Sequence, residues 1–154
     1  MKIFLLISIV LLFFGCSKIN NVAKNQPLVN LIVQQDKYSL IFKHQFYNNF
    51  ETFDKNLAKF IIETNLLFNT SNALSNNGNN NLNIIKGTVD FKILNKINSK
   101  IIKTGSISSS INTGSVSSLY SVDENNNFAK ERIAKYLASK LYRKILLNTY
   151  TSEN

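Results

Sequence analysis

Ile-Lys-Gly-Thr-Val-Asp-Phe-Lys-Ile, residues 85–93, decides the fold, because apolar or small residues alternate with polar ones along it. Successive side chains of a strand point to opposite faces, so this alternation predicts a strand with one buried face and one exposed face. Residues 95–99 contain the Asn and Ser of a turn, and residues 100–112 carry apolar residues of a second strand. The whole segment therefore predicts a long antiparallel hairpin.

The segment after the hairpin predicts a polar loop over residues 113–126 and an amphipathic helix over residues 127–147. Apolar residues recur there at every fourth position, which places them on one face of a helix. They are Ala129, Ile133, Leu137, Leu141 and Ile145. Basic residues near the C-terminal end of this segment complement the dipole of the predicted helix.

The first half of the chain leaves two interpretations open. Residues 28–33 predict a short strand. Phenylalanines spaced by three or four positions favour a helix over residues 38–55 and then a strand over residues 58–69. The same kind of spacing also fits a helix over residues 50–65. We favour the first interpretation, because residues 60–68 alternate as a strand does.

These elements together predict one α+β domain. With an Asn- and Gly-rich loop at residues 75–83, the order is strand, helix, three strands, helix. Two helices on one face of such a sheet make a two-layer sandwich. The expected fold is therefore β-α-β-β-β-α, with an antiparallel or mixed four-stranded sheet. The domain is expected to span residues 27–150, and residues 151–154 are a tail.

Residues 1–15 predict an export signal, because Lys2 precedes an apolar run that ends at Gly15. The run is shorter than the roughly 20 residues that a membrane-spanning helix needs. Cys16, the only cysteine, follows directly and is similar to the cysteine of a bacterial lipobox, so it is the expected lipid attachment site. Residues 16–26 would then form a lipidated, flexible tether. Alternatives are an ordinary signal cleaved nearby and an N-terminal helix that stays uncleaved.

Charge and composition constrain the partner and the chemistry. The formal net charge of +9 favours a partner that carries anions, and the export signal argues against nucleic acid. His44 is the only histidine, so the sequence offers little material for a transition-metal site. Neither a nucleophile elbow nor a phosphate-binding glycine loop is found in the sequence. We therefore expect no catalytic residues, no metal and no cofactor.

Several segments resemble a divergent member of the LPS-assembly lipoprotein family, LptE. Besides the lipobox, the similar residues are 87–94, 103–107, 118–122, 128–129 and 133–138. The resemblance covers most of the mature chain. It implies a lipid-anchored protein on the periplasmic side of the outer membrane, seated inside an LptD-like β-barrel. Such a protein supports assembly of the barrel and delivery of lipopolysaccharide to the cell surface, and it is not an enzyme.

Five lysines in the predicted hairpin become candidates for contact with lipopolysaccharide in the light of this resemblance. They are Lys86, Lys92, Lys96, Lys100 and Lys103, against one acid, Asp90. Ammonium groups bind phosphate as point charges, and lipopolysaccharide usually carries phosphate. A solvated strand face explains the same lysines without any ligand.

Two other roles fit the same features. Auxiliary lipoproteins of ABC-type lipid transport, which PqiC-like proteins exemplify, also combine a lipobox with a small α+β domain and a C-terminal helix. A surface lipoprotein of unrelated role would use its positive charge only for adhesion or solubility. A periplasmic hydrolase is disfavoured, because no catalytic constellation is visible.

Overall fold

The structure is a computed structural model of the chain, in which residues 29–50, 57–74, 81–113 and 119–151 are described. Its helices and strands follow the predicted order. They are β1 (Val29–Ile32), α2 (Lys37–Tyr47), β2 (Phe60–Leu74), β3 (Asn81–Asn95), β4 (Ile101–Thr113) and α3 (Leu119–Thr151). The predicted export signal, Cys16 and the tether lie outside the described residues, as does the tail after Thr151.

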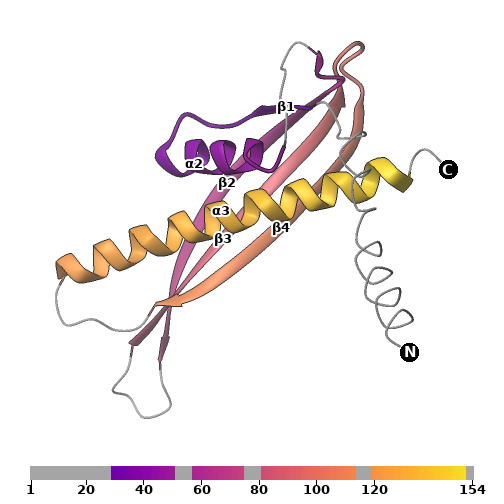
Figure 1. Ribbon diagram of the computed structural model, residues 1–154. Coiled ribbons are helices and arrows are strands. Elements are labelled where there is room, and N and C mark those ends of the chain that lie inside the picture. Colours follow the sequence, from indigo (N-terminus) through magenta and orange to yellow (C-terminus); the bar gives the residue numbers. More distant parts are fainter. Residues whose placement is uncertain (1–28, 51–56, 75–80, 114–118, 152–154) are drawn as a thin grey trace, which may run out of the picture.

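The strands form one sheet in the order β1-β2-β3-β4, and both helices lie on the same face of it (Figure 1). β1 pairs with β2 in parallel, whereas β2, β3 and β4 pair in antiparallel fashion. The sheet is therefore mixed, and the predicted α+β two-layer sandwich is confirmed. β3 lies between β2 and β4, with Val89 opposite Leu66 on β2 and Ile107 on β4.

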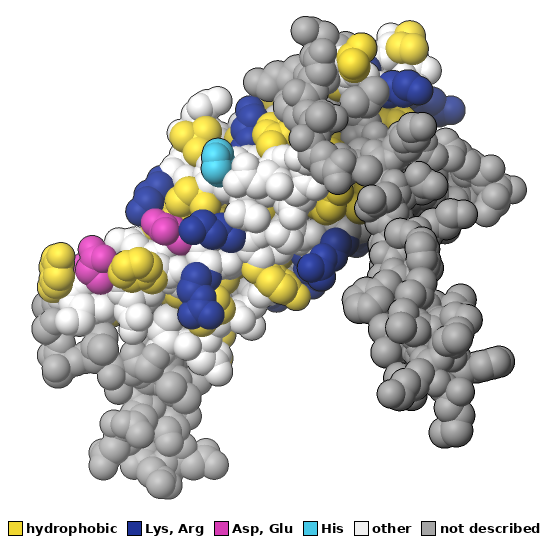
Figure 2. Space-filling model, viewed as in Figure 1, with side chains coloured by type: hydrophobic (Ala, Val, Ile, Leu, Met, Phe, Trp, Pro, Cys, Tyr) yellow, Lys and Arg dark blue, Asp and Glu magenta, His cyan; other side chains and the backbone are white. Residues whose placement is uncertain are grey.

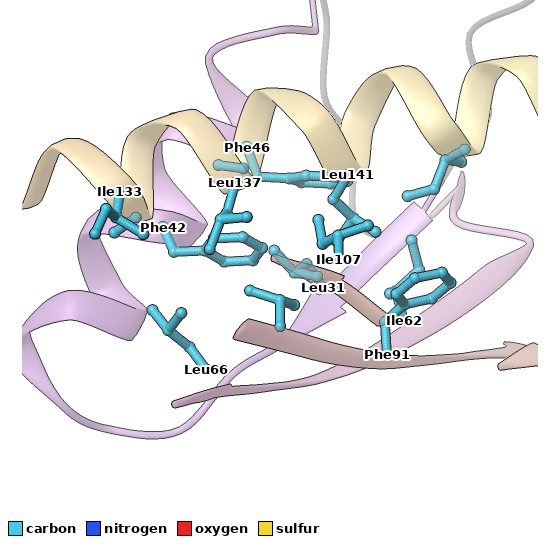
Figure 3. Packing of buried hydrophobic residues seen from close by; sticks show 14 of the residues in the cluster. Leu31, Phe42, Phe46, Ile62, Leu66, Phe91, Ile107, Ile133, Leu137 and Leu141 are labelled. Atoms are coloured by element: carbon cyan, nitrogen blue, oxygen red, sulfur yellow. The ribbon is translucent and has the colours of Figure 1, made fainter. Parts of the chain in front are cut away.

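The alternation along β3 has the predicted consequence for burial. Ile85 and Val89 are fully buried beneath the helices, whereas Lys86 and Lys92 on the opposite face are exposed. Figure 3 shows that large apolar side chains from both helices and from the strands meet in one layer between helices and sheet. The fully buried members labelled there are Leu31, Phe42, Phe46, Ile62, Ile133, Leu137 and Leu141.

Gly87 lets α3 lie directly against the middle of the sheet. A Cβ atom at this position would lie 2.4 Å from Cγ2 of Ile133, 3.1 Å from the ring of Phe68 and 3.2 Å from Cδ1 of Leu137. Contacts below about 3 Å between carbon atoms are repulsive, because optimal separations are about 3.5–4.0 Å. A side chain at position 87 would therefore push α3 away from β3.

The helix predicted over residues 38–55 is shorter than expected, because α2 ends at Tyr47. The side chain of Asn49 donates hydrogen bonds to the carbonyl oxygens of Gln45 (2.7 Å) and Phe46 (3.3 Å), which occupies acceptors at the helix end. Phe50 still packs on Tyr142, with ring centroids 4.9 Å apart. The phenylalanine spacing thus predicted packing correctly but overestimated the helix, and the alternative helix over residues 50–65 is wrong because β2 begins at Phe60.

Three boundaries differ from the predictions in Asn-rich segments. β2 continues to Leu74 and β3 starts at Asn81, within stretches predicted to lie outside these strands. Ladder hydrogen bonds join backbone groups, so polar side chains do not prevent the pairing. α3 begins at Leu119, inside the predicted loop over residues 113–126. Once a helix has nucleated, each further residue adds a hydrogen bond at small entropic cost, which explains the extension.

Side chains of the helices bind backbone groups on both edge strands. The Tyr47 hydroxyl accepts a hydrogen bond from the Leu31 amide of β1 at 2.8 Å. On the other edge, Lys140 of α3 donates to the carbonyl oxygen of Ser108 on β4 at 3.1 Å. Lys144 lies 3.5 Å from the carbonyl oxygen of the neighbouring Ser106. The helix layer therefore holds the first and last strands by polar contacts as well as by the core.

Asp36 caps the N-terminus of α2. One carboxylate oxygen accepts hydrogen bonds from the backbone amides of Tyr38 and Ser39, both at 3.0 Å, and the other accepts from the Ser39 hydroxyl. Partial burial alone would raise the pKa of Asp36. The hydrogen bonds from Ser39 and Tyr38 outweigh burial, so the pKa lies below its ordinary value of 3.8.

Replacing Gly87 by Ala is expected to lower the free energy of unfolding by about 1–3 kcal/mol, because the added methyl group overpacks the interface with α3. Urea unfolding of the purified protein measures the change. In an Ile133→Ala background, which removes the nearest atom, the same substitution is expected to cost less. An equal cost in both backgrounds would show that Gly87 is not required for this close contact.

Replacing Asp36 by Ala is expected to destabilise the protein by about 1 kcal/mol at neutral pH, as the loss of a helix cap does. The carboxylate contribution is fully present above pH 3.8 and is lost as the pH falls through the lower pKa of the folded state. The difference in melting temperature between wild type and variant should therefore narrow below about pH 4. Asp36→Asn, which keeps the acceptor, serves as the control and should retain most of the stability.

Candidate functional site

The structure separates the five candidate lysines instead of gathering them. Lys86 and Lys92 lie on the helix-free face of β3, six residues apart, which corresponds to about 20 Å along a strand. Lys96 and Lys100 lie in or beside the turn between β3 and β4, and Lys103 lies opposite Ile93 at the start of β4. The last three lysines lie together at one end of the hairpin, and Lys92 lies next to them along β3, on the helix-free face.

Lys92 belongs to an open groove on the helix-free face of the sheet, with a volume of about 690 Å³. Glu63 lies directly opposite Lys92 on β2, and Asp90 lies one pleat away on β3. Directly opposite residues in an antiparallel pair have their Cβ atoms about 5 Å apart, so Glu63 places a negative charge beside Lys92. The groove is lined by Glu63, Thr64, Asn65, Asp90, Phe91, Lys92, Thr104, Gly105 and Ser106.

The groove offers hydrogen-bonding groups, several of which are open to solvent. Both carboxylates, Glu63 and Asp90, are exposed to solvent. The side-chain oxygen of Asn65 is buried without a hydrogen-bond partner. No group of three or more His, Cys, Asp or Glu side chains suited to a metal ion is found within the described ranges. The groove therefore offers polar groups that are open to solvent.

His44, the only histidine, lies exposed on α2. Its Nδ1 atom is 3.2 Å from the side-chain nitrogen of Asn48, which lies one turn further along the chain.

Across the described part of the chain, no helix has both the length and the apolar character that crossing a membrane requires.

We call the end of the hairpin the hairpin tip and define it as residues 95–103 together with Leu57 and Lys59. The amide of Lys96 donates a hydrogen bond to the carbonyl oxygen of Lys59 at 3.0 Å, which joins the start of β2 to the turn. Lys59 thus adds a fourth exposed lysine to Lys96, Lys100 and Lys103. Figure 2 shows basic and hydrophobic side chains together at the end of the molecule that carries the β3–β4 turn in Figure 1.

Sequence reasoning missed Lys59 and the apolar residues of the hairpin tip. Lys59 is distant from the turn in sequence, and only the pairing of Phe60 with Asn95 brings it there. The sequence pattern assigns Ile97 to the turn and Ile101 to a strand, and it does not predict that either side chain is exposed. Ile97, at the turn, is 94% exposed.

No protein-family model matches the sequence, and no curated protein matches it significantly. Three solved structures have a similar fold. Rare lipoprotein B from Shewanella oneidensis gives a TM-score of 0.59 at 10% identity, over 82% of this chain and 98% of that chain. The minor lipoprotein from Acinetobacter baumannii gives 0.57 at 15% identity, over 79% and 93% of the two chains. A Caulobacter crescentus protein assigned to the lipoproteins gives 0.61 at 14% identity, over 82% and 92%.

At sequence identities this low, the structural similarity establishes a shared fold alone. The described α+β domain therefore has an architecture that bacterial lipoproteins use, and the likeness extends over nearly the full length of those three structures.

Proposed function

We propose that this chain is an outer-membrane lipoprotein of the lipopolysaccharide-assembly kind, anchored through a lipid on Cys16 at the periplasmic side. It would pair with an LptD-like β-barrel, support assembly of the barrel and help to deliver lipopolysaccharide to the cell surface. The observation that carries the proposal is the β-α-β-β-β-α fold, shared with bacterial lipoproteins, in a chain whose N-terminus reads as an export signal ending in Gly15-Cys16.

The proposed role is that of a binding partner, not of an enzyme. The hairpin tip combines exposed lysines with exposed apolar side chains, and lipopolysaccharide combines phosphate groups with acyl chains. Lys96, Lys100 and Lys103 are therefore better candidates for contact with lipopolysaccharide than Lys92, which lies opposite Glu63. Lys86 is also a poorer candidate, because it lies about 30 Å from the turn, measured along β3 at about 3.3 Å per residue.

A pull-down of the tagged chain from detergent-solubilised outer membrane is expected to recover a large β-barrel protein. Recovery of no barrel protein would contradict the proposal. Recovery of a lipid-transfer complex of the inner membrane would instead favour a transport auxiliary role. The Cys16→Ser variant is the control: it should lose its membrane anchor and keep the circular dichroism spectrum of the folded domain, so that a missing barrel can be traced to localisation.

Replacing Lys96, Lys100 and Lys103 together by Ser is expected to weaken binding of purified lipopolysaccharide, by about tenfold for each charge-assisted contact that is lost. Lys92→Ser should change the affinity little, because Glu63 lies directly opposite and would repel an anionic ligand. Fluorescence titration of the detergent-purified variants measures the effect. An unchanged affinity of the triple variant would exclude these lysines as the lipopolysaccharide contact.

A further inference from the structure

The hairpin tip exposes apolar side chains next to exposed lysines. Ile97 is 94% exposed, more than any other large hydrophobic residue in the described part of the chain. Leu57, Ile101 and Ile102 are each more than half exposed. Exposed apolar side chains that gather in one place mark sites of interaction with proteins, ligands or membranes.

This exposure is built into an ordered turn. The Asn95 amide donates to the carbonyl oxygen of Lys100 at 3.0 Å, and the Ser99 amide donates to the carbonyl oxygen of Asn95 at 2.9 Å. The side-chain oxygen of Asn95 accepts from the Ile97 amide at 2.8 Å, and that of Asn98 accepts from the Lys100 amide at 3.1 Å. These bonds hold the backbone on both sides of Ile97, so its side chain is presented outward at little entropic cost on binding.

The described charged residues of the hairpin tip are all basic. The hairpin tip contains four exposed lysines, Lys59, Lys96, Lys100 and Lys103, and no acidic residue. The next described acid along β2 is Glu63, while Glu51 and Asp54 lie outside the described residues. Exposed apolar side chains next to exposed lysines match a surface of anionic lipids, because the apolar side chain enters the acyl boundary while the lysines meet head-group phosphates.

The hairpin tip is also the end where the chain enters the domain. Val29, the first residue of β1, pairs with Phe60, which pairs in turn with Asn95 beside the turn. Cys16 precedes Val29 by thirteen residues, which span at most about 45 Å when fully extended. β2 and β3 have 15 residues each and are about 50 Å long, so a lipid on Cys16 reaches the hairpin tip with a relaxed tether, whereas the far end of the strands requires a nearly fully extended one.

We propose that the hairpin tip docks on the anionic phospholipid surface of the membrane to which the chain is attached. Ile97 enters the boundary between head groups and acyl chains, and Lys59, Lys96 and Lys100 contact lipid phosphates. This rests on the proposed function in one respect, namely that a lipid on Cys16 keeps the domain at the membrane. It goes beyond that function, because the protein surface itself, in addition to the lipid, then sets how the domain stands on the bilayer. Since Lys96 and Lys100 are also the candidates for lipopolysaccharide, the two kinds of phosphate would compete for this surface.

A cysteine-specific fluorophore tests the docking in the full chain. If lipid occupies the sulfur of Cys16, an introduced cysteine is the only free thiol. Ile97→Cys and Ser71→Cys are labelled with a polarity-sensitive dye, and each variant is reconstituted in vesicles of phosphatidylcholine and phosphatidylglycerol. Ser71 is exposed and lies near the far end of β2, which makes it the matched control. We expect lipids brominated on their acyl chains to quench the dye at position 97 and to leave the dye at position 71 unquenched.

A dye at position 97 that stays in water, or quenching that is equal at both positions, would overturn the proposal. A response at position 97 that needs added lipopolysaccharide would also overturn it, while leaving the proposed function intact. If the unsubstituted chain takes up the dye, Cys16 carries no lipid, and the lipid anchor of the proposed function fails. Position 97 is then measured in a Cys16→Ser background, where quenching still supports the docking and its absence still refutes it.

A second measurement tests the lysines, by sedimentation of the Cys16→Ser chain with the same vesicles. Replacing three lysines of the hairpin tip by Ser should reduce partitioning by roughly a hundredfold at low salt, at about fivefold for each lysine near an anionic surface. The matched control removes the same charge from the helix layer and should partition nearly as the parent does. The two sets are Lys59, Lys96 and Lys100 for the tip, and Lys43, Arg132 and Lys135 for the control. Equal losses in both sets would show that net charge alone governs binding and would refute docking by the tip.

Discussion

The close contact of α3 with Gly87 is the constraint on which the rest of the structure depends. Because position 87 has no side chain, Ile133 and Leu137 reach the backbone of β3, and the long helix lies flat across the hairpin. α2 then packs beside α3 and brings Phe42 and Phe46 into the same core. With both helices on one face, the other face of β2, β3 and β4 stays open to solvent and carries polar side chains.

Local patterns predicted what depends on local periodicity. The alternation around Val89 and the four-residue spacing around Leu137 identified the hairpin, the last helix and the fold class. The predictions that failed have two causes. The end of α2 after Tyr47 is set by a local side-chain contact, because Asn49 binds carbonyl oxygens of the last helical turn. The Asn-rich strand ends are set by backbone pairing between strands. Lys59 joined the candidate site only through its register with the hairpin, which no spacing in the sequence reveals.

The fold and the candidate chemistry have different origins in this molecule. The fold is common to lipoproteins that share 10–15% of their residues with this chain, so many sequences satisfy the same packing. The charged and apolar residues of the hairpin tip are not needed for that packing, because they lie outside the core.

A weak surface contact gains strength when a second attachment holds the domain nearby, since the second binding event then occurs at a high effective concentration. A lipid anchor and a small docking surface at the same end of a domain would act together in this way.

The polar contacts of α3 with β4 cover part of an edge of the sheet. Lys140 and Lys144 occupy carbonyl oxygens of a thirteen-residue edge strand, which otherwise offers a template for a strand of another molecule. A strand of a neighbouring copy would have to displace both lysines before it could pair with these carbonyl oxygens. The C-terminal half of α3 thus covers part of this edge and guards it against pairing with a second copy.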